Sequence, residues 1–504
     1  MTGQALPATQ SVEMPSTASD DVVYPLFMLD DTKTLRGIVV TWTLHFNDVL
    51  DPAKLHNALT ALLKIGDWRK IGGRLRMRTD SRLEICAPRN FTPERSAITY
   101  SQQRFDLNIE DHPLARTLPK ATKTSSVQVG PDDFRSFAAG PSAPTTLADF
   151  LDKDKPLLSM HITSFSDATS VGLSWPHVLM DIMGQQALVR AWSLVLAERE
   201  AEVPQCIGAH ADAIAEAASS PASTVEEYAL GKLRMGAIGM IKFGARFAWD
   251  LLWNTAVETR TVCIPAQAMS RLYSEAQQSL ATSAAGTGNS STPFVSEGDV
   301  LTAFFAHQVV SSLKQPRPVT ILHALNARFR LPALKASKGV YIQNMAVAAC
   351  AYLSADLVQG PLGPAALQNR ATLLEQATEH QVLAALRELH EQHQKKPGVD
   401  PNILSGDPNA LLMPFTNWTR ANLFEAVDFS PAIVRSSESG QTRSNPPGTM
   451  VYHHAASMQS NSAARNVIVV LGKDLAGNYW VTGVQLTTAA WARIENALQA
   501  LETN

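Results

Sequence analysis

The stretch Ser174-Trp175-Pro176-His177-Val178-Leu179-Met180-Asp181-Ile182-Met183-Gly184 organises the rest of the chain. It follows two apolar, β-branched runs, 157–165 and 170–173, which read as a hairpin. An apolar run with helical periodicity follows at 187–196. The pattern therefore places His177 on the turn between a strand and a helix, where a side chain is held rigidly and can still reach a cavity.

His177 and Asp181 are four residues apart, which suggests two interpretations. An imidazole can take up a proton near neutral pH, and a nearby carboxylate could steady it or its loop. The other interpretation is a histidine satisfied near a helix start, with Asp181 in the first turn, where a negative charge favours the helix dipole. The spacing alone also arises by chance, so it does not decide between them.

Five stretches in order resemble the motifs of the BAHD acyltransferases, especially the fungal branch with the trichothecene acetyltransferases. Besides His-x-x-x-Asp at 177–181, they are Pro25–Asp30, the helical run Leu55–Leu63 with Gly72–Leu75, Asn326–Arg330 with Tyr341–Asn344, and Thr416–Trp418 with Asp428-Phe429. The sequence departs from the family in two places. Ile182 stands where Gly follows the motif Asp, with Gly184 two residues later, and Asp428-Phe429 keeps only the start of Asp-Phe-Gly-Trp-Gly.

The resemblance implies an α/β fold of the α+β sandwich type, with two chloramphenicol-acetyltransferase-like domains and a tunnel between them. It also implies acyl transfer, most simply acetyl transfer, from acyl-CoA to a hydroxyl of a small secondary metabolite. CoA would be a co-substrate, with no bound cofactor and no metal. N-acylation, a condensation or cyclisation on the same fold, and a catalytically silent binding protein remain as alternatives.

The resemblance assigns roles around the motif. His177 would be the general base that deprotonates the acceptor. Asp181 would turn away from the substrate and pair with Arg328, which holds the His177 loop. The alternative for Arg328 is a solvated strand end.

A second group of residues would reach the site from the second domain. Thr416 and Trp418 would donate hydrogen bonds to the oxyanion of the tetrahedral intermediate, although core packing is the ordinary role of a tryptophan. Asp428 would be structural. The residues that bind the CoA phosphates are not identified, because no Lys or Arg lies between Arg271 and Lys314.

Composition narrows the class of protein. The chain has 504 residues, which favours two domains, and its net charge of −3 leaves no basic surplus for contacts with a nucleic-acid backbone, so we expect no nucleic-acid partner. The four cysteines are far apart and form neither a metal-spaced pair nor a disulfide framework, which favours a reducing compartment and a cytoplasmic location. We expect a monomer.

The chain divides by pattern into a disordered lead-in at 1–21, a domain at 22–200 that carries the motif, a crossover at 201–225 and a second domain at 226–504. The apolar run Met235–Trp253 carries Lys242, Arg246 and Asp250, so we expect a helix packed on the enzyme or lining its tunnel rather than a membrane span. Residues 281–292 read as a mobile loop, and Tyr452-His453-His454 as a loop or strand pair.

Overall fold

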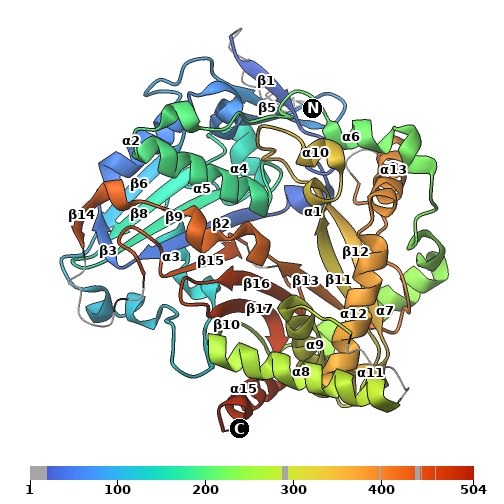
Figure 1. The fold of residues 1–504 in the computed structure, drawn as a ribbon. Coiled ribbons are helices and arrows are strands. Elements are labelled where there is room, and N and C mark those ends of the chain that lie inside the picture. Colours follow the sequence, from blue (N-terminus) through green and yellow to red (C-terminus); the bar gives the residue numbers. More distant parts are fainter. Residues whose placement is uncertain are drawn as a thin grey trace, which may run out of the picture.

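The computed structural model describes residues 20–286, 293–396, 399–436, 443, 445–459 and 461–503. The expected lead-in at 1–19 lies outside the described residues. Two mixed sheets, each covered by helices, form the two halves of the molecule (Figure 1). This is the α/β sandwich class expected from the sequence.

The first half is built on a five-stranded sheet that leads to the His177 turn. Its order is β15 (Tyr452–Ser457), β2 (Val39–Phe46), β9 (Thr169–Pro176), β8 (Ser159–Ser164), β6 (Thr99–Arg104). A three-stranded sheet, β1 (Val22–Pro25), β5 (Leu83–Ala87), β4 (Arg74–Met77), and the pair β14 (Ile433–Ser436) with β3 (Asp48–Leu50) complete it. The predicted hairpin is therefore β8–β9, which turns between Ser164 and Thr169.

Helices α2 (Pro52–Leu62) and α5 (Ile182–Leu196) pack together on this sheet. Helix α2 begins where expected, because the Asp51 carboxylate accepts hydrogen bonds from the backbone N–H groups of Ala53 and Lys54 at 2.8 and 3.1 Å. Trp192 of α5 is fully buried, and its indole N–H donates to the Leu55 carbonyl at 3.1 Å. The helix that follows His177 is thus fixed to the core.

The second half is built on a seven-stranded sheet. Its order is β12 (Ala346–Leu353), β11 (Val319–Asn326), β13 (Leu411–Asn417), β16 (Val467–Lys473), β17 (Tyr479–Thr487), β10 (Val257–Ile264), β7 (Ser126–Val129). Apolar side chains of five helices share one core with it: α8 (Ala266–Gly286), α9 (Glu297–Ser311), α11 (Ala355–Gln359), α12 (Leu362–Gln376) and α15 (Thr488–Thr503). The other described α-helices are α1 (Lys33–Arg36), α3 (Arg135–Ala138), α4 (Leu147–Asp152), α6 (Ala213–Ala218), α7 (Ala237–Trp253), α10 (Pro332–Lys335), α13 (Glu379–Lys395) and α14 (Leu423–Ala426).

Three described strands pair with a strand from the other side of the expected division of the chain, and β14 is one of them, because it pairs with β3. Strand β15, late in the chain, pairs antiparallel with β2 along all of Tyr452–Ser457. Strand β7, early in the chain, pairs with β10 at the edge of the seven-stranded sheet. The division of the chain at 201–225 stays a prediction, and these strands cross it in both directions.

Two expectations from sequence were wrong in part. Residues 281–286 continue α8 instead of forming a loop, because the Ala-rich run is a good helix former even without apolar anchors; residues 287–292 lie outside the described residues. The helix expected from Met235–Trp253 is present as α7, but none of its residues is buried.

The Tyr452-His453-His454 run is a strand whose histidines are buried together with His45 of β2. His45 contacts Ser170 Oγ at 2.8 Å and His454 at 3.4 Å, and the Trp42 indole donates to His453 Nδ1 at 3.2 Å. Burial lowers the pKa of His453 and of His454 to about 3, and it lowers the pKa of His45 well below 6.5. These rings are therefore neutral core groups at pH 7.

We predict that this cluster makes the fold sensitive to acid. Below pH 6.5 the unfolded chain protonates these histidines and the folded chain does not, so stability falls as the pH drops from 6.5 towards 3, by about 1.4 kcal/mol per pH unit for each ring. Melting temperatures measured across this range should decline less steeply for His454→Gln than for the unchanged protein. The exposed His210, replaced by Gln, is the control, and equal slopes in all three proteins would contradict the prediction.

Candidate active site

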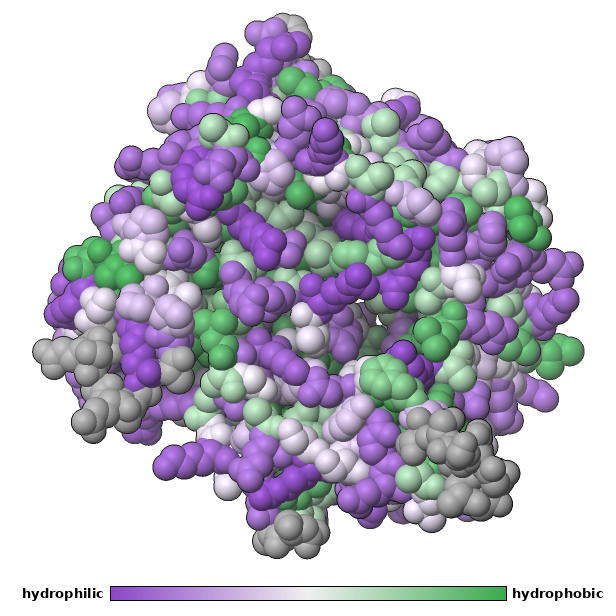
Figure 2. Space-filling model, in the orientation of Figure 1, coloured by the Kyte–Doolittle hydropathy of each residue, from purple (hydrophilic) through white to green (hydrophobic). Residues whose placement is uncertain are grey.

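His177 sits on the turn between β9 and α5, as the sequence predicts. Strand β9 ends at Pro176, the His177 backbone N–H donates to the Ile38 carbonyl at 2.9 Å, and α5 starts at Ile182. Only this short turn, 177–181, separates the two rigid elements. The face of the molecule in Figure 2 is hollowed near its centre, between the two halves.

Asp181 uses both carboxylate oxygens. Oδ1 accepts from the N–H groups of Met183 and Gly184 at 3.0 and 3.2 Å and so caps α5. Oδ2 accepts from Arg328 Nη1 at 2.7 Å and from the Met345 N–H at 3.1 Å. Because Arg328 and Met345 belong to the second half, this carboxylate ties the His177 turn to it.

Arg328 is held as firmly as its partner. It lies on the 3-10 turn Ala327–Phe329 after β11, and its Nη2 donates to the carbonyls of Tyr341, at 2.9 Å, and Gln343. The side chains of Asp181 and Arg328 are 11% and 10% exposed, so the charges are largely removed from water. Removing one partner of such a pair leaves the other charge uncompensated.

Asn344 and Asp30, to which the motif resemblance assigned no role, form a second link to the His177 turn. Asn344 Nδ2 donates to the His177 carbonyl at 3.0 Å and to Asp30 Oδ1 at 2.9 Å, and the Asn344 N–H donates to the same Oδ1 at 2.8 Å. Burial raises the pKa of Asp30 to about 6, and the attraction of Lys70 opposes this rise. The sequence signal for these two residues was their position in the stretches that resemble the family's motifs, Pro25–Asp30 and Tyr341–Asn344.

Gly184 explains why the shifted glycine of the motif is needed. A Cβ at this position would lie 2.3 Å from the Ile342 carbonyl oxygen and 2.7 Å from Met180 Cβ. The first turn of α5 therefore approaches the 341–345 segment too closely for a side chain. The glycine permits the contact through which Asp181 reaches Met345 and Arg328.

The His177 imidazole is suited to accept a proton. Burial lowers its pKa below 6.5, against the raising effects of its own carbonyl oxygen, Asp181 and Asn344. Within the described residues, Nδ1 is buried without a hydrogen-bond partner of good geometry. Because this pKa is lowered from 6.5, the ring is neutral at pH 7, and a neutral imidazole carries a lone pair on one of its two nitrogens that can accept a proton.

Thr416 and Trp418 lie at the end of β13. The Trp418 indole N–H donates to Thr416 Oγ1 at 3.1 Å, and Trp418 packs against the core that holds Val178–Met180. Thr416 also lines a mainly apolar cavity of about 260 Å³ between β11, β12 and β13. The indole donor is thus already used, and the hydroxyl hydrogen of Thr416 is the donor left for another acceptor.

Asp428 is exposed. Its carboxylate accepts from the Ser430 N–H at 2.9 Å, and its backbone N–H donates to Ser193 Oγ of α5 at 3.0 Å. These contacts shape the chain after α14 and involve neither His177 nor Arg328.

Known proteins resemble the chain along nearly its whole length. The O-acetyltransferase PaAT-2 of Phomopsis amygdali is 34% identical over 496 residues, which cover 96% of this chain and 99% of the relative. The acetyltransferase adrJ of Penicillium roqueforti is 36% identical, with 97% of each chain covered. The chain belongs to the fungal BAHD-type acyltransferases.

The fold of the chain also matches the fold of solved acyltransferase structures. The structure of F. sporotrichioides TRI101 complexed with coenzyme A and T-2 matches with a TM-score of 0.60 at 14% identity, covering 93% of this chain and 96% of that one. No family model matches the chain. The full-length relatives confirm the family inferred from the five motifs, and the solved structures confirm its fold.

We predict that the Asp181–Arg328 ion pair holds the His177 turn to the second half of this acyltransferase, and we call this pair the latch. Asp181→Asn keeps an oxygen for the α5 cap but removes the charge, and Arg328→Met removes the other charge. Each change should destabilise the protein by about 3 to 5 kcal/mol, because it strands a largely buried charge. The measurement is a double-mutant cycle on unfolding.

The double variant should be less damaged than the sum of the two changes, because the second substitution removes the stranded charge. Arg443→Met, which breaks the similarly buried Arg443–Asp48 pair at β3, is the matched control and should add independently to Asp181→Asn. Strictly additive losses for Asp181→Asn with Arg328→Met would rule out the latch.

Proposed function

We propose that the protein transfers an acyl group, in the first instance acetyl, from acyl-CoA to a hydroxyl of a small molecule, with His177 as general base. The observation that carries the proposal is a neutral imidazole on a turn fixed from both sides. At the Asp181 end of the turn, Arg328 Nη1 donates to the Asp181 carboxylate at 2.7 Å. At the His177 end, Asn344 Nδ2 donates to the His177 carbonyl at 3.0 Å. A base held in this way loses little entropy on reaction.

The reaction needs only one base. His177 Nε2 takes the proton from the acceptor hydroxyl as its oxygen attacks the thioester carbonyl carbon. The tetrahedral intermediate collapses, the C–S bond breaks, and the imidazolium returns the proton to the CoA thiolate. The thioester is already activated, so no covalent enzyme intermediate is required.

Thr416 is the proposed oxyanion donor. Its Oγ1 accepts from the Trp418 indole at 3.1 Å, which orients the hydroxyl and polarises its O–H bond. The developing negative charge then receives one aligned hydrogen bond. Trp418 acts through Thr416 in this proposal and is a positioning residue.

The proposal extends to the substrates and the setting. The cavity of about 260 Å³ beside Thr416 is lined mainly by apolar side chains and suits an apolar portion of a substrate. The relatives named acetyltransferases support acetyl as the group transferred. We propose a single chain acting in the cytoplasm, with CoA as co-substrate and no resident metal or cofactor; amine acceptors are the second candidate class.

The test is turnover of acetyl-CoA against matched panels of alcohols and amines. We predict that His177→Ala keeps the unfolding midpoint and loses at least about 100-fold in kcat, the usual share of a general base. His210→Ala, an exposed histidine, is the control. Near-normal turnover in His177→Ala would remove this residue from the mechanism, and ester against amide products would decide the acceptor class.

We predict that Thr416→Val lowers kcat about 100- to 1000-fold with little change in KM, because its hydroxyl acts on the transition state. Trp418→Phe should cost less, since it only leaves the hydroxyl less well oriented. Thr416→Ser keeps the donor and should retain most of the activity. If Thr416→Val raised KM alone, the residue would only shape the pocket.

A further inference from the structure

Helix α7 carries a row of large apolar side chains on its outer face. Ile238, Ile241 and Leu252 are 73%, 72% and 73% exposed, and Trp249 and Trp253 are 52% and 69% exposed. The two indole rings stack with centroids 4.4 Å apart. The chain as described leaves this face uncovered, and such a contiguous apolar face marks a site of interaction.

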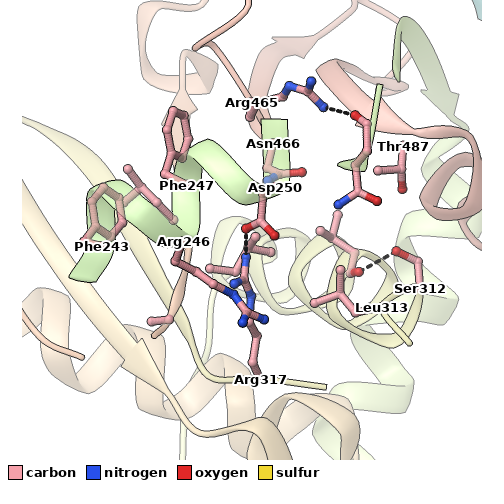
Figure 3. A pocket seen from close by; sticks show the side chains of 15 residues that line it. Phe243, Arg246, Phe247, Asp250, Ser312, Leu313, Arg317, Arg465, Asn466 and Thr487 are labelled. Atoms are coloured by element: carbon pink, nitrogen blue, oxygen red, sulfur yellow. Dashed lines mark hydrogen bonds and ion pairs between the residues drawn. The ribbon is translucent and has the colours of Figure 1, made fainter. Parts of the chain in front are cut away.

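The exposed row follows from helical spacing. Ile238, Ile241, Trp249 and Leu252 follow one another at intervals of three, eight and three residues. At about 3.6 residues per helical turn, these intervals place the four side chains on one side of α7. Phe243, Phe247 and Asp250 fall on the other side and line a small pocket towards the body of the protein (Figure 3). Apolar side chains therefore lie on both the inner and the outer side of α7, and the outer ones pack on no part of the described chain.

Positive charge lies beside this apolar face. Lys242 is exposed and, four residues after Ile238, falls on the same side as the apolar row, and Arg246 is exposed at the edge of that row. In Figure 3 the guanidinium group of Arg246 points towards that of Arg317 beneath the helix. The carboxylate in the same pocket is Asp250, which pairs with Arg317.

Arg317 has unused donors. Its side chain is 10% exposed, and its Nη2 bonds to Asp250, whereas Nε and Nη1 are buried and have no partner among the described residues. A buried cation with two unused donors, next to a second guanidinium, is a site for a phosphate oxygen. The pocket holds about 40 Å³, which admits a small polar group and no large ligand.

The occupant must satisfy both the apolar row and the arginines. A second copy packed by two-fold symmetry on α7 would bring Lys242 and Arg246 near the same residues of its partner, and like charges would repel. An anionic phospholipid surface supplies an apolar layer and phosphates together. A helix that exposes tryptophans and other apolar side chains together with basic residues can lie in the plane of such a surface.

The helix is suited to lie on a membrane and not to cross one. It has 17 residues, and among the described residues no helix is long and apolar enough to span a bilayer. We propose that α7 docks on an anionic phospholipid surface, with its apolar row in the headgroup–acyl boundary and a lipid phosphate bound by Arg246 and Arg317. None of these residues belongs to the proposed catalytic machinery, so the docking is independent of His177.

The test is co-sedimentation of the full chain with vesicles. The protein should sediment with phosphatidylcholine–phosphatidylserine vesicles, far less with phosphatidylcholine alone, and less as salt is raised. The double variant Ile241→Ser with Leu252→Ser should bind at least about tenfold more weakly, because apolar carbons are withdrawn from the lipid. Leu374→Ser with Val434→Ser removes equally exposed apolar side chains elsewhere, at 57% and 67% exposure, and should bind normally.

Two further experiments test the role of positive charge on α7 and the depth of its tryptophans in the lipid layer. Arg246→Glu should weaken binding to the anionic vesicles more than Arg104→Glu, the same change at a distant exposed arginine. Brominated lipid should quench tryptophan fluorescence, and Trp249→Phe with Trp253→Phe should remove most of the quenching. Unfolding midpoints within the normal range show that each variant folds.

Three results would overturn the proposal. The protein could stay in the supernatant with anionic vesicles at low salt, or the α7 variants could bind no worse than their controls. Sedimentation equilibrium could instead show a dimer, without vesicle binding, that Ile241→Ser with Leu252→Ser converts to a monomer. The face would then be a surface for self-association.

Discussion

The arrangement of the proposed active site depends on one carboxylate. Asp181 caps the helix that follows the His177 turn and, through its other oxygen, binds Arg328 and the Met345 N–H of the opposite half. The same carboxylate thus starts α5 and holds the two halves of the molecule together. Gly184 makes this possible, because only a residue without a Cβ lets the 341–345 segment come so close.

Burial then gives the site its chemistry. Burial lowers the pKa of His177, and Asn344 holds its backbone carbonyl, so the neutral state of the ring and its position arise from different contacts. The same physical effect acts on His453 and His454, which burial also keeps neutral. What distinguishes His177 is its place on a turn between two rigid elements, β9 and α5.

Local pattern predicted the elements near the motif and could not predict the contacts that complete the site. Periodicity alone places His177 after a strand and before a helix, and family-like stretches supplied Arg328. The bond from Trp418 to Thr416 depends on side-chain orientation at the end of β13, which no spacing encodes. The pairing of Tyr452–Ser457 with β2 joins residues about four hundred positions apart, and a short run with two histidines gives no sign of its partner. The outward apolar face of α7 was missed because apolar periodicity ordinarily marks a buried side.

The crossing of β15 into the first sheet has a consequence for synthesis on the ribosome. Until residue 452 emerges, β2 is an unpaired edge whose side chains are made for a buried interior. The distance along the chain from Phe46 to Tyr452 is 406 residues. At about 5 to 20 residues per second, that edge waits roughly 20 to 80 seconds for its neighbour. The nascent first half therefore emerges with an incomplete sheet, and its unpaired edge is open to wrong pairing until Tyr452–Ser457 has been synthesised.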